Sequence, residues 1–511
     1  MDRSSVESKD TRARAAERLE QAHQHALRHE DDSARQAYRE AAALFAEGNH
    51  PLGQARALAA LGHLERRQQR MAEAAAAYGQ AAGLFRAGDD LAGQAAVARG
   101  QAELAERLGR FDDARAAYEE ARELYHGHRE RLGQAHAVYG LGRLEGRHHR
   151  RAEARAALEE ARGLYRQAED QLGEANVAKA MGGLELRENQ PDRAQEHYTT
   201  AQHLYRQVET QLGEANVLLS LGNLENRRHH LHEAQQLYSD ALALYRLIGN
   251  PLGEANALTA LGLLDVRRDR FDTARKALDE ARALYARIGN PLGRANAIKG
   301  LGDAAGKRGQ VDEARAGYRE AAALFLEAGD PLGEANAHVG MADLERRAGN
   351  VDAAHAAYDR AHALYTAIGS GLGQANVRKG LGHLARAMGD AGAAEEDYRQ
   401  ALALYRAAGS AVGEANILTA QGDLERRRGN LAAAREAYQE AAALYERIGN
   451  EAGQANATLG LALLAADDGN DDALRWFKQS ANLYQSAGYA ELETRVRALG
   501  RRFQDRTPQA P

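Results

Sequence analysis

Hydrophobic positions along this chain follow the period of an α-helix and change phase about every twenty residues. Within residues 251–290, one apolar stripe predicts a first helix from about Leu252 to Arg268. This stripe consists of Ala257, Leu261 and Leu264. A second stripe predicts a second helix that ends near Ile288, and it consists of Ala274, Leu278, Ala281, Leu284 and Tyr285. The predicted unit is therefore a helix, a short turn and a second helix.

Residues that favour turns and caps lie between these stripes. Asp272 is predicted to be the N-cap of the second helix, and Gly289 with Asn290 suits a left-handed C-cap. Pro251 suits the first position of a helix. Within the first helix, Gly262 lies where a second helix can approach closely.

The unit recurs every 40 residues in twelve consecutive blocks, from residue 11 to residue 490. Aromatic residues recur in two phases, which we interpret as inter-helix core. The first series is Phe45, Phe85, Tyr125, Tyr165, Tyr205, Tyr245, Tyr285, Phe325, Tyr365, Tyr405, Tyr445 and Tyr484. The second is Tyr38, Tyr78, Tyr118, Tyr198, Tyr238, Tyr318, Tyr358, Tyr398 and Tyr438. Such a period is typical of a solenoid, in which each unit buries its apolar face against its neighbours.

We therefore predict an all-α fold with one continuous array and no linker between domains. Residues 1–10 are expected to be a disordered N-terminus, and residues 11–490 form the array of twelve repeats. Residues 491–505 are predicted to be a C-terminal capping helix, and residues 506–511 a disordered tail. The first unit, which is rich in polar residues, is expected to cap the other end.

The pattern within one block resembles the tetratricopeptide repeat family, in a variety with a forty-residue period. Leu261 and Gly262 match the family's first helix, and Ala274, Leu278 and Ala281 match its second helix. The resemblance covers nearly the whole chain. It implies a right-handed α-α superhelix, a solenoid of helix-turn-helix repeats, whose first helices line a concave groove that binds peptides or partner proteins.

Two polar rows follow the predicted first helices. Asn256 and Arg267 are eleven residues apart, so they differ by about 20° around the helix axis and share one stripe, about 100° from the apolar ridge. The asparagine row is Asn176, Asn216, Asn256, Asn296, Asn336, Asn376, Asn416 and Asn456. The arginine row includes Arg147, Arg187, Arg227, Arg267, Arg347 and Arg427. We predict that both rows line the groove and bind the partner.

The chemistry of these rows suits an extended, acidic segment. An asparagine amide can pair with both groups of a peptide backbone, and one amide per helix matches roughly three residues of extended chain. Arginine favours carboxylates through bidentate bonds, including a free C-terminus. Two alternatives stay open. The asparagines could tie each first helix to the preceding turn, and the arginines could belong to a solvated mixed-charge surface, since Glu225 lies beside Arg227.

A third row on the same stripe varies from block to block. It consists of His63, Glu103, Arg143, Gly183, Asn223, Leu263, Asp303, Asp343, His383, Asp423 and Leu463. A variable row beside two constant rows could read different partner side chains. Drift at an unselected surface position would give the same variability.

Composition narrows the function classes further. The net charge of −6 gives no broad basic field of the kind that nucleic-acid binders carry. No apolar stretch approaches twenty residues, no signal-peptide pattern opens the chain, and there is no cysteine. We therefore expect a cytoplasmic protein without disulfides, thiol catalysis or a membrane span.

Histidines cluster at His126, His128, His136, His148 and His149, and again at His229, His230 and His232. They fall mainly around predicted turns, so we expect neither a metal site nor a cofactor. No phosphate-binding loop or nucleophile motif occurs, and an open groove with repeating chemistry lacks converging catalytic groups. We predict a non-catalytic scaffold for a protein or peptide partner. The alternatives are a self-assembling homo-oligomer and, less in keeping with the charge, a nucleic-acid-binding solenoid.

Overall fold

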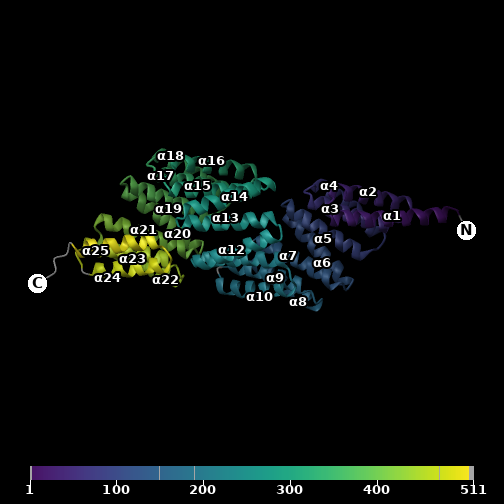
Figure 1. Ribbon diagram of the computed structural model, residues 1–511, viewed down its shortest axis with the longest axis horizontal. Coiled ribbons are helices and arrows are strands. Elements are labelled where there is room, and N and C mark those ends of the chain that lie inside the picture. The colour runs from purple at the N-terminus through teal and green to yellow at the C-terminus, as the bar shows by residue number, and fades with distance from the viewer. Residues whose placement is uncertain (1–2, 149, 189, 471, 506–511) are drawn as a thin grey trace. The chain divides into compact units, whose positions relative to one another are not determined.

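Helical hairpins account for the fold. The computed structural model describes residues 3–148, 150–188, 190–470 and 472–505, and within these residues the regular secondary structure is α-helical (Figure 1). The chain divides into unit 1, residues 1–214, and unit 2, residues 215–511. Each unit is a stack of antiparallel hairpins that pack against their sequence neighbours. A helical-repeat solenoid, as predicted, is confirmed.

The odd-numbered helices are the first helices of the hairpins. In unit 1 they are α1 (Arg3–Leu27), α3 (Pro51–Arg67), α5 (Leu91–Arg107), α7 (Arg131–Arg147) and α9 (Gln171–Arg187). Helix α11 (Gln211–Arg227) begins at the end of unit 1 and continues into unit 2. Unit 2 continues with α13 (Pro251–Arg267), α15 (Pro291–Lys307), α17 (Pro331–Arg347), α19 (Gly371–Ala387), α21 (Ala411–Arg428) and α23 (Glu451–Asp467).

The even-numbered helices are the second helices. In unit 1 they are α2 (Asp31–Glu47), α4 (Met71–Ala87), α6 (Phe111–Gly127), α8 (Arg151–Gln167) and α10 (Pro191–Gln207). In unit 2 they are α12 (Leu231–Leu247), α14 (Phe271–Arg287), α16 (Val311–Glu327), α18 (Val351–Ala367), α20 (Ala391–Ala407), α22 (Leu431–Arg447) and α24 (Asp472–Ser486). The last helix is α25 (Ala490–Gln504).

Turn chemistry explains where the first helices begin. Gly289 has a φ of +67°, the left-handed conformation that ends a helix, as predicted. Asn290 does not share that conformation: its φ is −105°, and its side chain accepts a hydrogen bond from the backbone N–H of Gly293 at 2.9 Å. It is therefore the N-cap of the next helix rather than part of a C-cap. The same bond to the third residue of the helix recurs at Asp90, Asp170, Asn250, Asp330, Ser370, Ser410 and Asn450.

The prediction that Asp272 caps the second helix is wrong. The N-cap is Arg270, which makes no side-chain capping bond, and Asp272 lies in the first turn of α14. The turn between the helices is shorter than expected, because Asp269 already has a φ of +57° and the next helix starts two residues later. In the first turn the Asp272 carboxylate still stabilises the positive end of the helix dipole.

Aromatic rings fill the space between hairpins, and glycines make room for them. Both series of aromatic residues that the sequence predicts to be core are buried, among them Tyr238, Tyr245 and Tyr285. A Cβ atom on Gly253, at the start of α13, would lie 2.1 Å from the ring of Tyr245. On the other side of the same helix, a Cβ on Gly262 would lie 2.5 Å from Leu278. Close helix approach at Gly262 is thus confirmed.

Successive first helices define one side of each stack. Helix α13 contacts α15, and α3 contacts α5, whereas successive second helices make no comparable contact in the described part of the chain. Elements that touch on one side and diverge on the other produce a curved stack whose inner side carries the touching elements. We call the solvent-facing side of the first helices the first-helix face.

The ends of the array differ from its middle. Helix α1 already begins at Arg3, within the segment expected to be disordered. Helix α25 occupies the position predicted for a C-terminal capping helix, and it covers the last hairpin by burying Val496 next to Phe477. Residues 506–511 lie outside the described residues. No helix among the described residues is long and apolar enough to cross a membrane.

Candidate functional site

The asparagine row lies on the first-helix face and is tied to buried tyrosines. Asn256 is exposed, yet its Oδ1 accepts a hydrogen bond of 2.7 Å from the hydroxyl of Tyr285, on the second helix of the same hairpin. The same bond joins Tyr205 to Asn176, Tyr245 to Asn216, Tyr365 to Asn336, Tyr405 to Asn376, Tyr445 to Asn416 and Tyr484 to Asn456, at 2.6–2.8 Å. Buried hydroxyls require such partners, so these asparagines have a structural role.

Asn296 is the exception in the row. Its hairpin carries Phe325 in place of tyrosine, so no hydroxyl is present to donate a hydrogen bond to Asn296. The Asn296 amide instead donates to the backbone carbonyl of Leu292 at 3.0 Å, and the residue is exposed. Asn296 is therefore an exposed asparagine of the row that has no contact with a tyrosine hydroxyl.

The tyrosine contact differs from the alternative that the sequence left open. That alternative tied the asparagines to the preceding turn, whereas the observed partner of Asn256 is Tyr285, near the end of the second helix of the same hairpin. The bond engages Oδ1 and leaves the two N–H donors of the amide outside it. Partner binding by the asparagine row remains a prediction. The amide N–H groups are the donors that could bind the partner.

The variable row is tied to the other tyrosine series. In six hairpins with a tyrosine fifteen residues downstream, its hydroxyl pairs with an Asp, Asn or His of the row at 2.6–2.9 Å. These pairs are His63 with Tyr78, Asn223 with Tyr238, Asp303 with Tyr318, Asp343 with Tyr358, His383 with Tyr398 and Asp423 with Tyr438.

Where the second helix carries leucine instead, the variable row changes with it. Leu158 is accompanied by Arg143, and Leu278 by Leu263. Pairing with tyrosine therefore gives the row a structural role that the sequence did not suggest. It does not account for the choice among Asp, Asn and His, because the partner is tyrosine in each of these pairs.

The arginine row reaches back to the preceding first helix. The guanidinium of Arg267 donates to the backbone carbonyl of Asn226 at 3.2 Å and contacts His229 at 2.9 Å. In the next repeat, Lys307 donates to the carbonyl of Val266 at 2.9 Å. These carbonyls lie at helix C-termini, where a cation is favoured by the helix dipole. Exposed members of the row are Arg147, Arg187, Arg227, Arg347 and Arg427.

The acidic residues beside the arginine row do not form a solvated surface with it. Glu225, two residues before Arg227, is buried and pairs with Arg228 and His230 at 3.1 and 2.7 Å. The equivalent carboxylates pair with an arginine of the preceding second helix, as Glu345 does with Arg315 at 2.6 Å. These carboxylates are therefore engaged by arginines outside the arginine row.

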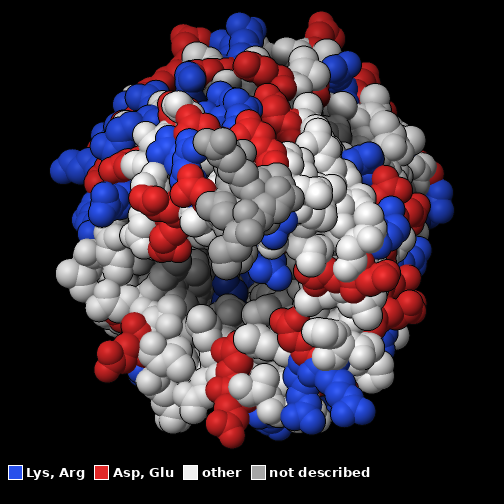
Figure 2. Space-filling view, turned by 90° about the vertical axis from the view of Figure 1, so that its right-hand side faces the viewer, with Lys and Arg blue, Asp and Glu red and all other residues white. Residues whose placement is uncertain are grey.

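A pocket of about 450 Å³ opens on the first-helix face of unit 1, and we call it the unit 1 pocket. It is lined by Arg66, Arg99, Glu103, Glu106, Arg107, Tyr118, His136, Tyr139, Gly140, Arg143 and Arg147. These residues come from α3, α5, α6 and α7. Figure 2 views the molecule from the N-terminal side of Figure 1 and shows Lys and Arg side chains interspersed with Asp and Glu on that surface. Of the predicted site residues, only Arg147 belongs to this pocket.

The arginines of the unit 1 pocket create a positive field. Burial and the nearby Arg99 and Arg66 lower the pKa of His63 to about 4. The pKa of His136 is lowered by burial and by Arg99, and that of Lys179 by burial and by Arg143. The arginines of the pocket thus disfavour the protonated forms of His63, His136 and Lys179, which lie on different helices.

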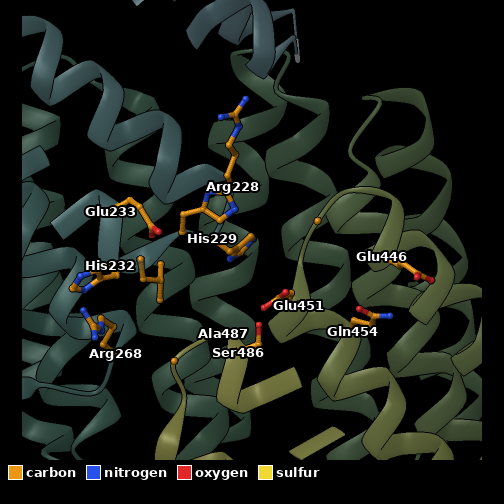
Figure 3. Close-up of a pocket in the computed structure, with 14 residues that line it drawn as sticks. Arg228, His229, His232, Glu233, Arg268, Glu446, Glu451, Gln454, Ser486 and Ala487 are labelled. Carbon is orange, nitrogen blue, oxygen red and sulfur yellow. The ribbon is translucent and has the colours of Figure 1, made fainter. Parts of the chain in front are cut away.

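Unit 2 contains a second cavity, of about 550 Å³ (Figure 3). The α11–α12 turn lines it with Arg228 and His229, and the start of α23 lines it with Glu451. Nearby, Tyr489 packs against a cluster formed by Leu231, Ala234, Tyr238 and Leu264. Mixed charges line this cavity, and no group of His, Asp and Glu among the described residues has the arrangement of a metal site.

The histidine clusters are only partly gathered by the fold. His229, His230 and His232 line the unit 2 cavity, whereas His136 lines the unit 1 pocket. His148 stacks on Phe111 with ring centroids 3.7 Å apart, and His149 lies outside the described residues. The sequence grouped these residues by proximity along the chain, and the fold distributes them differently.

Sequence reasoning missed the unit 1 pocket, although a signal was present. The asparagine row begins at Asn176, and the corresponding positions of earlier repeats hold Arg56, Ala96 and His136. The pocket lies where this pattern is broken. Departures from the consensus of a repetitive array would have located it.

Comparison with known proteins matches one part of the chain to a repeat family. Residues 333–407 match the family model described as tetratricopeptide repeat, and no curated protein shows significant similarity in sequence. Aspartyl phosphate phosphatase F from Bacillus subtilis is 14% identical, with 68% of this chain and 93% of that chain covered and a TM-score of 0.48. A Rap protein complexed with competence and sporulation factor is 16% identical, with coverages of 78% and 99% and a TM-score of 0.47. Yeast Tom70 is 15% identical, with 97% of each chain covered and a TM-score of 0.42. At these values the likenesses carry no argument about ligands.

Proposed function

Because this chain carries tetratricopeptide repeats, we propose that it is a non-catalytic scaffold that binds an extended, acidic segment of a partner protein along its first-helix face. The proposal rests on the asparagine row, in which seven amides are oriented by tyrosine hydroxyls. A fixed orientation lowers the entropy lost when a ligand binds. Asparagines needed only as hydrogen-bond acceptors could be buried, but these are exposed or half-buried.

The spacing of the row suits a peptide backbone. Packed helices lie about 8–10 Å apart, which corresponds to roughly three residues of extended chain. Since Oδ1 is engaged by tyrosine, each amide offers its N–H donors to the carbonyl oxygens of the bound segment. Binding through the backbone would tolerate many partner sequences.

The arginine row would select acidic segments. Arg187 and Arg427 are exposed on the same stripe as the asparagines, and guanidinium groups form bidentate bonds with carboxylates. A cytoplasmic location is part of the proposal, because a chain without cysteine has no need of an oxidising compartment.

Two matched sets of variants test the proposal. A partner is first captured from native lysate by the wild-type chain and identified by mass spectrometry, and its affinity is then measured by calorimetry. Replacing Asn256, Asn296 and Asn336 by alanine is expected to weaken binding at least tenfold. The control carries Tyr285→Phe and Tyr365→Phe, which break the same tyrosine bonds and keep the amides.

The two sets separate a binding role from a structural one. If the asparagines bind the partner, the tyrosine control keeps its affinity to within about threefold. Equal loss of affinity in both sets would mean that the row acts only through the fold, and the proposal would be wrong. Circular dichroism at 222 nm reports whether both sets remain helical.

A further inference from the structure

The unit 1 pocket carries more positive charge than its own carboxylates balance. Five arginines and two glutamates line it, so three positive charges within the lining are uncompensated. In unit 2, by contrast, the cavity of Figure 3 is lined by two arginines and three glutamates, together with three histidines. The excess of guanidinium groups in the unit 1 pocket is therefore not shared by the unit 2 cavity.

Two glutamates hold four of these arginines in place. Glu103 pairs with Arg66 at 2.6 Å and with Arg99 at 3.5 Å, so it links α3 to α5. Glu106 pairs with Arg143 at 3.4 Å and also with Arg147, so it links α5 to α7. Each carboxylate thus orients two guanidinium groups: those paired with Glu103 lie on α3 and α5, and those paired with Glu106 lie on α7.

The arginines retain hydrogen-bonding capacity. The Nε atoms of Arg66 and Arg99 are buried and have no hydrogen-bond partner within the described structure. A buried donor without a partner costs free energy, which a bound anion would recover. The Cζ atom of Arg143 lies over the ring of Tyr139, 5.7 Å from its centroid, which is a cation–π contact.

The pocket departs from the later repeats at the asparagine row. Three residues after that row, the pocket holds Arg99 and Tyr139, and later repeats hold either a lysine (Lys179, Lys299 and Lys379) or an uncharged residue such as Leu219. The asparagine row itself is replaced by His136 here. The pocket therefore lacks the asparagine amide that later repeats carry and has an imidazole in its place.

We propose that the unit 1 pocket binds a phosphoryl group. A dianion would neutralise most of the excess charge, and oxygens arranged around a tetrahedral centre can meet guanidinium groups that converge from three helices. A single carboxylate is planar and is satisfied by one bidentate arginine. The inference rests on the proposed function, because the phosphoryl group is expected on a phosphorylated side chain of the partner segment. Free phosphate is the other source of the same chemistry.

Calorimetry on the full chain tests this assignment. The probes are a hexapeptide with one central phosphoserine, the same peptide with serine, the same peptide with two adjacent aspartates, and inorganic phosphate. The phosphopeptide is expected to bind at least tenfold more tightly than the serine peptide, and to lose affinity severalfold between 50 and 300 mM salt. Inorganic phosphate that binds as tightly as the phosphopeptide would identify a free anion as the ligand.

Variants locate the bound group. Arg99→Gln combined with Arg143→Gln should weaken phosphopeptide binding at least tenfold, while Arg287→Gln combined with Arg447→Gln, two exposed second-helix residues outside both the pocket and the arginine row, should change it less than twofold. Arg107→Glu alters an exposed side chain, so it provides a test even if the double variant fails to fold, and it should weaken binding about threefold or more.

The outcomes distinguish this inference from the proposed function. Equal affinity for the phosphoserine, diaspartate and serine peptides, or binding that is insensitive to the pocket variants, would overturn the phosphoryl assignment. If the captured partner still loses affinity in the asparagine variants, the scaffold function stands alone. Failure of both experiments would reject both.

Discussion

At the scale of single residues, tyrosine hydroxyls explain the repeated polar pattern. Each buried hydroxyl needs an acceptor, and the first helix supplies one at either of two positions, as Asn216 and Asn223 do for Tyr245 and Tyr238. Recurrence of a polar residue in this chain therefore has a structural reason whether or not a partner binds there.

The asparagine row offers its own matched pair for measuring this contribution. Asn256→Ala removes the acceptor of the Tyr285 hydroxyl and should lower the free energy of unfolding by about 1–2 kcal/mol. Asn296→Ala, in a hairpin with Phe325, should change it by less than about 0.5 kcal/mol. Urea denaturation followed by circular dichroism measures both, and equal losses would contradict the hydrogen-bond explanation.

Two histidines that pair with tyrosine hydroxyls should make the fold sensitive to acid. Burial, with Arg99 and Arg66, lowers the pKa of His63 to about 4, and burial with neighbouring cations lowers that of His383 to about 3. Both lie below the unfolded value of about 6.5, so their stabilisation is complete above pH 6.5 and is lost as the pH falls toward 4.

Asparagine at the same position, as found naturally at Asn223, accepts the hydroxyl without titrating. His63→Asn with His383→Asn should therefore reduce the loss of unfolding free energy between pH 7 and pH 4.5 by about 1–2 kcal/mol per histidine. Urea titrations of the variant and the wild type at the two pH values measure this difference. The effects of carboxylate titration are common to both proteins and cancel in the comparison. An unchanged acid response would refute the assignment.

At the scale of helices, the packing of each hairpin on the next depends on glycine at the start of the first helix. The ring of Tyr245 occupies the space that a Cβ atom of Gly253 would need. The glycine is retained for close approach and not for an unusual backbone angle, because it lies within α13.

Gly253→Ala should therefore destabilise the chain by about 1–3 kcal/mol, even though alanine is the better helix former. The control is Gly79→Ala in α4, where an added Cβ would meet nothing within 4 Å, and there a gain of about 0.5–1 kcal/mol is expected. Thermal unfolding gives the sign of each change, and stabilisation by both substitutions would contradict the packing explanation.

At the scale of the whole molecule, stability is distributed along the chain because hairpins pack on their neighbours. A local defect should remain local. Hydrogen exchange of the Gly253→Ala variant is expected to accelerate in α11–α16, while amides of α1–α8 keep their wild-type rates. Acceleration throughout the chain would indicate cooperative unfolding of the entire array instead.

The sequence by itself determined the hairpins, because helix periodicity and turn chemistry are local properties. The predicted helix from Leu252 to Arg268 is observed as Pro251–Arg267, and the buried stripe of the second helix, from Ala274 to Tyr285, is buried as expected. Local reasoning failed at caps such as Asp272, where the length of a turn depends on how closely two helices pack, and at the N-terminus, where α1 begins at Arg3.

The tertiary structure decided which polar groups meet. Asn256 and Tyr285 are 29 residues apart on different helices, so no local pattern states that one binds the other. The unit 1 pocket likewise draws Arg66, Arg99 and Arg143 from three hairpins. Ion pairs and hydrogen bonds between helices form only where the two groups lie close in space. The packing of the helices sets those distances.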